Sequence, residues 1–108
     1  MEGTFKLENK NGTLEITLAG GLDARNAPML SEKLQEYKGQ SIMEMVFFVH
    51  ELTYISSAGI RVLIFAVQKI LQPGADAYLI GAIPEVMTVL EMTGIDDSFI
   101  IADSYPKS

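Results

Sequence analysis

The chain has 108 residues, 48% of them hydrophobic, with a formal net charge of −6, a pI near 4.6 and no cysteine. This length holds one hydrophobic core, so we expect a single domain over residues 1–108. The acidic balance without a Lys/Arg cluster argues against nucleic acid or an anionic membrane surface as the partner, and the absence of cysteine excludes disulfides, thiol catalysis and zinc–thiolate sites.

The N-terminal third of the sequence predicts a hairpin followed by a helix. Residues 5–8 and 14–18 alternate apolar and polar side chains, as half-buried strands do, and Asn11-Gly12 between them is a strong turn signal. Gly20-Gly21 is expected to end the second strand. From residue 26 to about residue 38, apolar side chains recur at helical spacing, with a proline near the start and a glycine at the end.

The middle of the sequence predicts a buried strand, a loop and a buried helix. Residues 43–49 are almost uninterruptedly apolar, which is typical of a strand covered on both faces in a sheet with helices packed against it. Residues 51–59 are expected to form a loop. Residues 58–71 are expected to form a helix that is apolar on most of its circumference, with Pro73-Gly74 stopping it.

The C-terminal third predicts a strand over residues 77–80, a helix over 84–92 capped by Gly94, a strand over 98–101 and a frayed tail over 104–108. The order ββαβαβαβ argues for an α/β fold with an N-terminal hairpin and a mixed, mostly parallel central sheet packed with helices. The sequence begins without the basic and apolar regions of a secretory signal, and charged or polar residues interrupt its apolar stretches. We therefore expect cytoplasmic localisation and no membrane insertion.

The sequence contains no recognisable catalytic, metal or cofactor site. Ser57 does not stand in a G-x-S-x-G turn, and the single histidine, His50, at the mouth of the same predicted loop is more typical of a surface or packing residue than of a catalytic base. One histidine, no cysteine and scattered carboxylates give no metal-ligand spacing, and there is no P-loop. We therefore expect no enzyme activity, no metal and no cofactor.

The start of the second predicted helix carries the most functional information. Ser57 is followed by Ala58 and Gly59, small residues that leave backbone N–H groups accessible where the helix dipole favours an anion. A serine in this position either caps the helix or, being exposed, serves as a phosphorylation site. On the residues alone, the cap is the better interpretation.

Residues 54–63 resemble the signature of STAS domains, the anti-sigma factor antagonists of bacteria, in which Asp-Ser-Ser/Ala-Gly-Leu precedes an apolar helix. Residues 20–23, Gly-Gly-Leu-Asp, are similar to the family's Gly-Glu-Leu-Asp between its second strand and first helix. Residues 84–94 resemble the family's third helix and its exit. The similarity covers nearly the whole chain in the same element order, and it implies a STAS fold.

The resemblance implies that Ser57 is the phosphorylated residue, with Ser56 as the second choice. Ser56 stands where the family has aspartate, so phosphorylation is expected to be slow or absent if that carboxylate assists the transfer or the docking. Arg61, one turn after Ser57, is expected to pair with a partner carboxylate, to fold back on the phosphate, or to be simply solvated. Asp23 either joins this surface or only caps the first helix. The predicted partner-binding residues are Asp23, Asn26, Ser56, Ser57, Ala58, Gly59 and Arg61.

The function that the resemblance implies is partner switching. The unphosphorylated chain would bind an anti-sigma factor that is itself a serine kinase and so free a sigma factor; phosphorylation of Ser57 would break the complex, and a serine phosphatase would restore it. The alternative is a STAS docking subunit of another assembly, such as a lipid-transport ATPase or a stress-signalling complex, without phosphorylation. A small hydrolase using Ser57 and His50 is the third hypothesis.

Overall fold

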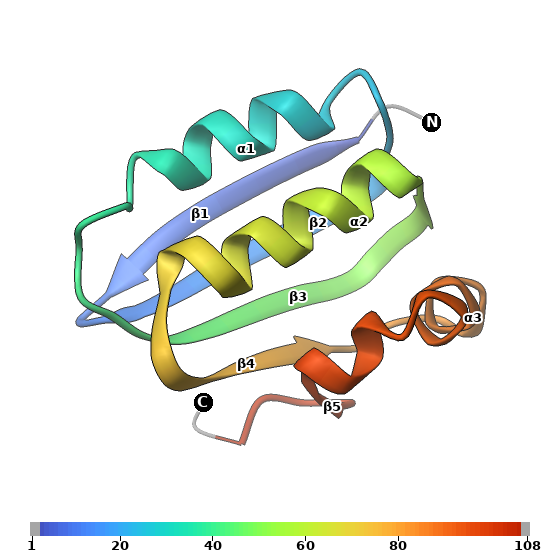
Figure 1. The fold of residues 1–108 in the computed structure, drawn as a ribbon. Coiled ribbons are helices and arrows are strands. Elements are labelled where there is room, and N and C mark those ends of the chain that lie inside the picture. The colour runs from blue at the N-terminus through green and yellow to red at the C-terminus, as the bar shows by residue number, and fades with distance from the viewer. Residues whose placement is uncertain (1–2, 107–108) are drawn as a thin grey trace.

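The computed structural model describes residues 3–106 and contains five strands and three α-helices (Figure 1). In chain order the elements are β1 (Thr4–Lys10), β2 (Thr13–Leu22), α1 (Ala27–Gln35), β3 (Ile42–Ile55), α2 (Ser57–Phe65), the π-helical turn η1 (Ala66–Ile70), β4 (Leu71–Ile80), α3 (Pro84–Thr93), the 3-10 turn η2 (Ile95–Ser98) and β5 (Ile100–Ala102).

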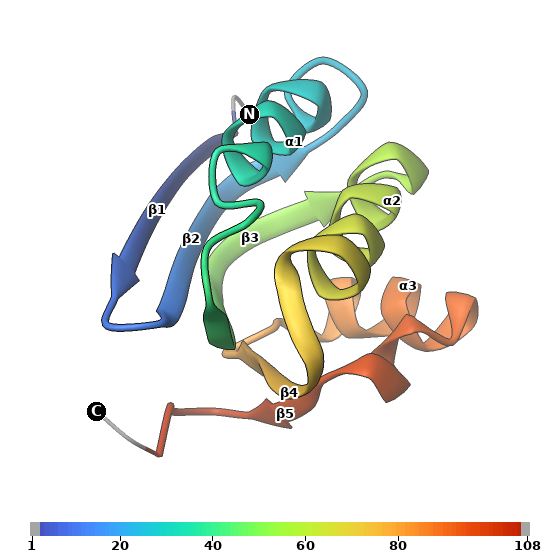
Figure 2. The ribbon, with the colours of Figure 1, turned by 60° about the vertical axis from the view of Figure 1, so that its left-hand side comes forward.

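The strands form one mixed sheet whose order, β1-β2-β3-β4-β5, is the order of the chain. β1 is antiparallel to β2, and the neighbouring pairs from β2 to β5 are parallel. Every parallel crossover moves the same way across the sheet, and such crossovers are right-handed, so the helices collect on one face (Figure 2). The predicted α/β class, the order ββαβαβαβ and the mostly parallel sheet are confirmed.

The predicted hairpin between β1 and β2 is confirmed. Lys10 pairs with Thr13, and the two residues between them have positive φ angles, 54° at Asn11 and 92° at Gly12. This is the geometry that a tight two-residue hairpin turn needs. The Gly12 N–H also donates to the Asn9 side-chain oxygen at 2.9 Å, which holds the turn closed.

β2 and β3 both extend beyond their predicted ends, and these two predictions were wrong. Gly20-Gly21 does not end β2, and residues 51–55 are strand rather than loop. The two strands continue as parallel partners up to the pair Leu22↔Ile55, through two register shifts in which β3 carries the extra residues. Gly20, with φ of 74°, accommodates the irregular pairing that a side chain would strain.

The boundary between α2 and β4 also differs from the prediction. The helical segment ends at Ile70 through a π-helical turn, and Leu71 already pairs with Ile42. Pro73-Gly74 therefore does not stop the helix. It lies in an irregular part of β4, where four residues separate the paired positions Leu71 and Asp76 while one residue separates their partners on β3. Proline is tolerated in such a bulge because no ladder hydrogen bond is needed there.

Smaller differences concern α1 and β5. α1 ends at Gln35, and the predicted last turn to residue 38 consists of i→i+3 hydrogen bonds, such as Tyr37 N–H to Leu34 O at 3.0 Å. The predicted strand over 98–101 is shifted to Ile100–Ala102 because residues before it form η2. The helix α3 is confirmed, with Gly94 as a left-handed C-cap.

The sheet has a helix-covered face and an open face. The main core lies between the sheet and the helices and includes Leu14, Phe47 and Leu79 from the strands with Leu30 and Leu63 from α1 and α2. A separate small cluster of Val46, Tyr78 and Ile80 lies on the other face, where Phe48, Ala102 and Tyr105 pack against it. The buried strand predicted at 43–49 is thus covered by helices on one face only.

Tyr105 differs from the frayed tail expected over 104–108. Its ring packs edge-on against Tyr78, with centroids 5.3 Å apart, and against Phe48 at 6.2 Å. Its hydroxyl donates a hydrogen bond to Oε1 of Glu44, which is buried on the same face. Residues 107 and 108 of the predicted tail lie outside the described residues.

Candidate partner-binding site

The carboxyl ends of β2 and β3 bring together two segments that are more than 30 residues apart in the sequence. Leu22 and Ile55 are the last paired residues of the two strands, and the Ser56 N–H donates to the Leu22 carbonyl at 2.8 Å. The turn that begins at Asp23 and the helix that begins at Ser57 therefore leave the sheet side by side. The carboxyl edge of a parallel sheet is the usual place for a binding site.

Ser56 and Ser57 divide the two roles that the sequence left open for one serine. Ser56 is the N-cap of α2: it has an extended backbone, and its Oγ accepts the Gly59 N–H at 3.2 Å. Ser57 is the first helical residue and is exposed. Among residues 3–106, no hydrogen bond partner holds the Ser57 hydroxyl. The structure therefore leaves Ser57 accessible for modification and gives the capping role to Ser56.

Gly59 is buried, unlike the rest of the predicted partner-binding surface. A Cβ atom on Gly59 would lie 2.8 Å from Leu22 Cγ and 2.9 Å from Ile55 Cγ1. The glycine thus allows the first turn of α2 to pack closely on the ends of β2 and β3. Its place in the motif is explained by this packing rather than by contact with a partner.

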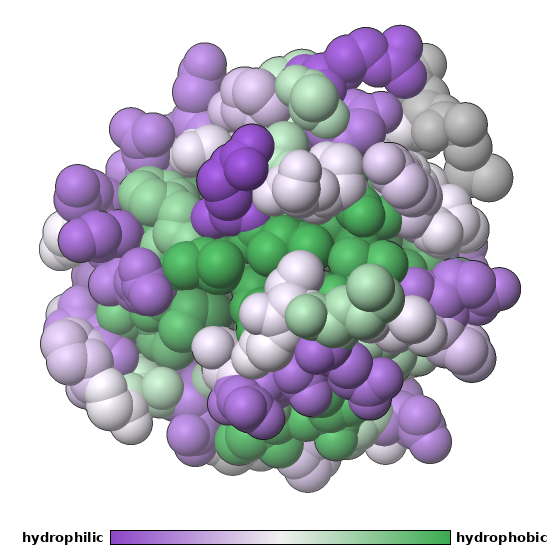
Figure 3. All heavy atoms as spheres, turned by 45° about the vertical axis from the view of Figure 1, so that its right-hand side comes forward, coloured by the Kyte–Doolittle hydropathy of each residue, from purple (hydrophilic) through white to green (hydrophobic). Residues whose placement is uncertain are grey.

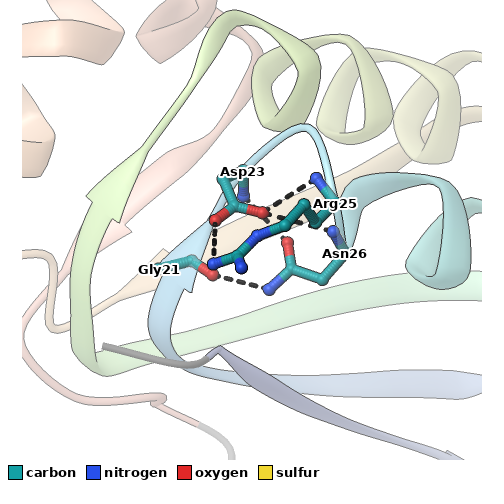
Figure 4. A network of polar contacts seen from close by, with 4 residues as sticks. All are labelled: Gly21, Asp23, Arg25 and Asn26. Atoms are coloured by element: carbon teal, nitrogen blue, oxygen red, sulfur yellow. Dashed lines mark hydrogen bonds and ion pairs between the residues drawn. The ribbon is translucent and has the colours of Figure 1, made fainter.

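Asp23 and Asn26 form a hydrogen-bonded turn (Figure 4) that directly follows Leu22, the residue whose carbonyl accepts the Ser56 N–H. Asp23 Oδ1 accepts the backbone N–H groups of Arg25 at 2.9 Å and Asn26 at 3.2 Å, and Oδ2 lies 3.5 Å from the Arg25 guanidinium. The Asn26 side chain accepts the Asp23 N–H at 2.8 Å and donates to the Gly21 carbonyl at 2.7 Å. These bonds fix the turn to the end of β2.

The N-cap of α1 is Asn26, so the prediction that Asp23 caps this helix needs correction. Asp23 instead accepts the N–H groups of the turn before the helix. The Arg25 N–H is the main cause that lowers the pKa of the Asp23 carboxyl below its ordinary value of 3.8; the Asn26 N–H and the Arg25 guanidinium act in the same direction, while desolvation opposes them. Asp23 is therefore ionised near neutral pH.

Arg61 lies at a shallow groove between α1 and α2. The groove has a volume of about 340 Å³, and its lining consists of Ala27, Pro28, Ser31, Ala58, Arg61, Val62 and Phe65. Two predicted partner-binding residues, Ala58 and Arg61, thus share one concave surface with the start of α1. Arg61 is exposed, and none of the residues 3–106 forms an ion pair with it.

His50 is not close to Ser57, so the hydrolase hypothesis loses its geometric basis. β3 continues five residues beyond His50, which corresponds to roughly 15 Å of strand. His50 Nε2 lies 3.3 Å from the Asp103 carbonyl oxygen, and its ring lies against Gly81. In the described part of the chain, no group of three or more His, Cys, Asp or Glu side chains is arranged to hold a metal ion. No helix within residues 3–106 is long and apolar enough to cross a membrane.

Apolar side chains around this edge escaped the sequence reasoning. Figure 3 turns the right-hand side of Figure 1 forward and shows an apolar band between polar regions. Exposed large apolar residues include Tyr54 near the end of β3, Ile64 on α2 and Met92 on α3, which is 81% exposed. A second groove, lined partly by Leu63, Ile64 and Val67, separates α2 from the segment after α3. The helix predicted over residues 58–71 was expected to be largely buried, and the exposure of Ile64 was missed because helical periodicity does not show which neighbour covers each side chain.

Known proteins resemble this chain over most of its length. Residues 4–107 match the family model of the STAS domain. The anti-sigma-B factor antagonist of Listeria monocytogenes is 27% identical over 90 residues, which cover 83% of this chain and 79% of the relative. The crystal structure of an anti-sigma factor antagonist from Mycobacterium paratuberculosis aligns with a TM-score of 0.83 at 19% identity, over 98% of this chain and 90% of that chain.

Two structures of SpoIIAA share the fold as well. The anti-sigma factor antagonist SpoIIAA in its unphosphorylated form aligns with a TM-score of 0.76 at 17% identity, over 96% of this chain and 92% of that chain. The Bacillus cell fate determinant SpoIIAA in its phosphorylated form aligns with a TM-score of 0.73 at 17% identity, over 96% of this chain and 94% of that chain.

Proposed function

Because this chain belongs to the STAS domain family, as the match over residues 4–107 demonstrates, we propose that it is an anti-sigma factor antagonist that acts in the bacterial cytoplasm. The Listeria monocytogenes relative and the Mycobacterium paratuberculosis structure both carry this description. Residues 1–108 act as one domain, which binds an anti-sigma factor at the carboxyl ends of β2 and β3.

The exposed hydroxyl of Ser57 is the observation that carries the proposal. It stands on the first residue of a helix whose N-cap is already supplied by Ser56. Beside it, the hydrogen-bonded turn of Asp23 and Asn26 and the side chains of Ala58 and Arg61 offer a preformed surface. A partner that binds this surface covers the hydroxyl, so a change at Ser57 acts directly on the complex.

The switch is phosphorylation of Ser57 by the anti-sigma factor acting as a serine kinase. The Ser57 oxygen attacks the γ-phosphorus of ATP, the bond to the β-phosphate oxygen breaks, ADP leaves, and a base of the kinase takes the hydroxyl proton. A serine phosphatase hydrolyses the phosphoserine with water and releases inorganic phosphate. Ser56, whose oxygen is engaged as the cap, is the second choice for modification.

Phosphate at Ser57 affects the interface more than the fold. A phosphoserine carries about −1.5 to −2 charges at neutral pH, and the start of a helix favours negative charge by about 0.3–1 kcal/mol. In a complex shaped around a hydroxyl, the same charge must lose its hydration, which costs several kcal/mol. The existence of SpoIIAA, a relative with the same fold, in phosphorylated and unphosphorylated forms supports a switch without unfolding.

The test is a titration of the cognate anti-sigma factor with the wild-type chain, Ser57→Asp and Ser57→Ala, alongside thermal melts. Ser57→Asp should bind more than a hundredfold more weakly while melting close to wild type. Ser57→Ala should keep its affinity and resist phosphorylation. If Ser57→Asp binds as tightly as wild type, the switch is refuted.

A docking subunit that works without phosphorylation is the second candidate function. The observation that favours it is Ser56, which stands in place of the aspartate of the family signature. In that case Ser57 remains unphosphorylated, and the affinity of the chain for its assembly does not depend on charge at Ser57. The same titration of Ser57→Asp separates the two functions.

A further inference from the structure

The groove between α1 and α2 combines apolar walls with a single charge. Ala27, Pro28, Ala58, Val62 and Phe65 supply its apolar lining, Ser31 is its one neutral polar residue, and Arg61 is its only charged residue. A groove of this composition fits an apolar side chain well. It also offers a planar, bidentate donor to any carboxylate or phosphate that reaches its rim.

Arg61 has no acidic neighbour available to it. Although the chain carries a net charge of −6, it has no Asp or Glu between residues 57 and 75, and Arg61 and Lys69 are the charged residues of that stretch. Asp23, at the same edge of the sheet, is already engaged by two backbone N–H groups and by Arg25. No ion pair reaches Arg61 from any residue within 3–106. The guanidinium is thus available for an anion from outside.

Ser57 and Arg61 lie on the same side of α2. The helix is regular from Ser57 to Phe65, so these two residues are four positions apart on one helix, with Cβ atoms about 6 Å from each other. An acidic group four residues before a basic one is the favourable orientation for a pair on a helix. A phosphate on Ser57 is therefore within reach of the side chain of Arg61, which also lines the groove.

We propose that the α1–α2 groove receives a segment of the anti-sigma factor that presents a carboxylate beside an apolar side chain, and that Arg61 binds this carboxylate. Phosphate on Ser57 then draws Arg61 into an intramolecular pair and removes the partner's counter-charge. This inference rests on the proposed function. Phosphorylation then weakens the complex in two ways: the phosphate has to lose its hydration, and it competes with the partner's carboxylate for Arg61.

The intramolecular half of this mechanism is testable without a partner. In the chain phosphorylated on Ser57, ³¹P NMR follows the second ionisation of the phosphate. The pKa of the phosphate should be higher in Arg61→Gln than in wild type, and the difference should vanish at about 1 M salt, where an exposed pair is screened. Lys69→Gln removes the same charge from the same helical segment and should leave the pKa at the wild-type value. Equal titration of wild type and Arg61→Gln would overturn the pairing.

The intermolecular half is tested with the anti-sigma factor used for the Ser57 variants. Arg61→Gln should bind about tenfold more weakly or worse, Arg61→Lys should fall between it and wild type, and Lys69→Gln should stay within about threefold of wild type. Thermal melts of each variant confirm that the fold persists, since both positions are exposed. Wild-type affinity for Arg61→Gln would refute the carboxylate contact.

A double-mutant cycle separates this inference from the proposed function. The weakening caused by Ser57→Asp should be several-fold smaller in the Arg61→Gln background, because the counter-charge is already gone. If Ser57→Asp weakens binding equally in both backgrounds, the competition for Arg61 is refuted and the proposed switch stands. If Ser57→Asp has no effect in wild type, the proposed switch itself fails.

Discussion

Gly59 shows how the absence of one methyl group sets the depth at which α2 packs. The residue has an ordinary helical backbone, so the need for glycine comes from its neighbours and not from its φ angle. Leu22 and Ile55, the last residues of two parallel strands, fill the space where a Cβ atom would be. This close approach holds the first turn of α2, which begins at Ser57, against the ends of β2 and β3.

Gly59→Ala is expected to lower the free energy of unfolding. The new methyl group would overlap two buried, branched side chains, and such overpacking costs about 1–3 kcal/mol. The better helix propensity of alanine returns about 1 kcal/mol at most. Urea denaturation measures the difference, with Ser57→Ala as the control on the same turn, expected within about 0.5 kcal/mol of wild type. A free energy of unfolding that Gly59→Ala leaves unchanged would mean that Leu22 and Ile55 shift to accommodate the methyl group at little cost.

Asp23 should contribute a pH-dependent part of the stability. Its pKa is lower in the folded chain than its ordinary value of 3.8, so between these two values the unfolded chain binds more protons. Its contribution is therefore complete above about pH 5 and is lost as the pH falls through 3.8 towards the folded value. Asp23→Asn should be less stable than wild type at pH 7, and the difference should shrink at a pH below 3.8. Urea denaturation at both pH values checks this; a constant difference would contradict it.

Two substitutions at Ser56 distinguish its role as the helix cap from an effect on the phosphorylation of Ser57. Ser56→Ala removes the oxygen that accepts the Gly59 N–H and should cost about 0.5–2 kcal/mol of stability. Ser56→Asp keeps a good capping group, so its melting should stay close to wild type. If a carboxylate at this position assists the kinase, Ser56→Asp should be phosphorylated faster on Ser57, as followed by mass spectrometry over time. An unchanged rate would assign the carboxylate no part in the transfer.

At the scale of elements, β3 connects the two faces of the sheet. Its inward residues belong to the main core, whereas Glu44, Val46 and Phe48 belong to the open face. Tyr105 covers this face from the end of the chain. Burial and the neighbouring Glu44 carboxylate raise the pKa of the Tyr105 hydroxyl, which therefore stays protonated and keeps donating its hydrogen bond.

Tyr105→Ala should destabilise the domain more than Tyr105→Phe. Alanine removes the ring contacts with Phe48 and Tyr78, a loss of about 1–3 kcal/mol for a half-buried aromatic side chain. Phenylalanine keeps the ring and removes only the hydrogen bond to the Glu44 carboxylate. This lowers the free energy of unfolding by no more than about 3 kcal/mol. Urea denaturation of the two variants compares the stability lost with the ring contacts with the stability lost with the hydrogen bond alone. Equal stability of both variants and wild type would show that this segment contributes nothing.

The sequence predicted the elements whose signals are local. Asn11-Gly12 supplies the positive φ angles of the hairpin, and Gly94 supplies the left-handed cap of α3. The ends of β2 and β3 were missed because Gly20-Gly21 reads as a break when the strand is considered alone. Pairing with the neighbouring strand keeps it extended. Likewise, Pro73-Gly74 reads as a helix stop, although pairing of Leu71 with Ile42 had already ended the helix.

The candidate site was predictable to the same extent. The motif predicted Ser57 at the start of a helix and near Asp23. Both predictions follow from the order of strands and helices along the chain, without knowledge of how the elements pack. What the sequence did not reveal is which residues of the motif face outward. Ala58 and Arg61 line the groove, whereas Gly59 is buried beneath them, and this depends on how closely α2 approaches the sheet.

At the scale of the whole molecule, the proposed partner-binding surface and the small cluster around Tyr105 lie on different sides of the sheet. The surface around Ser57 lies at the carboxyl edge on the helix-covered side, and Tyr105 lies against the open face. Figure 2 shows the C-terminal segment leaving on the side away from α1 and α2. Tyr105→Ala should therefore lower the melting temperature and leave the affinity for the anti-sigma factor within about twofold below the melting range. A large loss of affinity would reveal coupling through the sheet.

The strand order of the sheet bears on how the molecule is made. Because β1 to β5 lie in the order in which a ribosome delivers them, each strand meets an edge that already exists, and none has to insert between two earlier ones. Each parallel pair joins consecutive strands whose partner residues are 22 to 33 residues apart, so no strand pairing has to close a loop that spans most of the chain. The chain is therefore able to condense from its N-terminus during synthesis, one strand at a time.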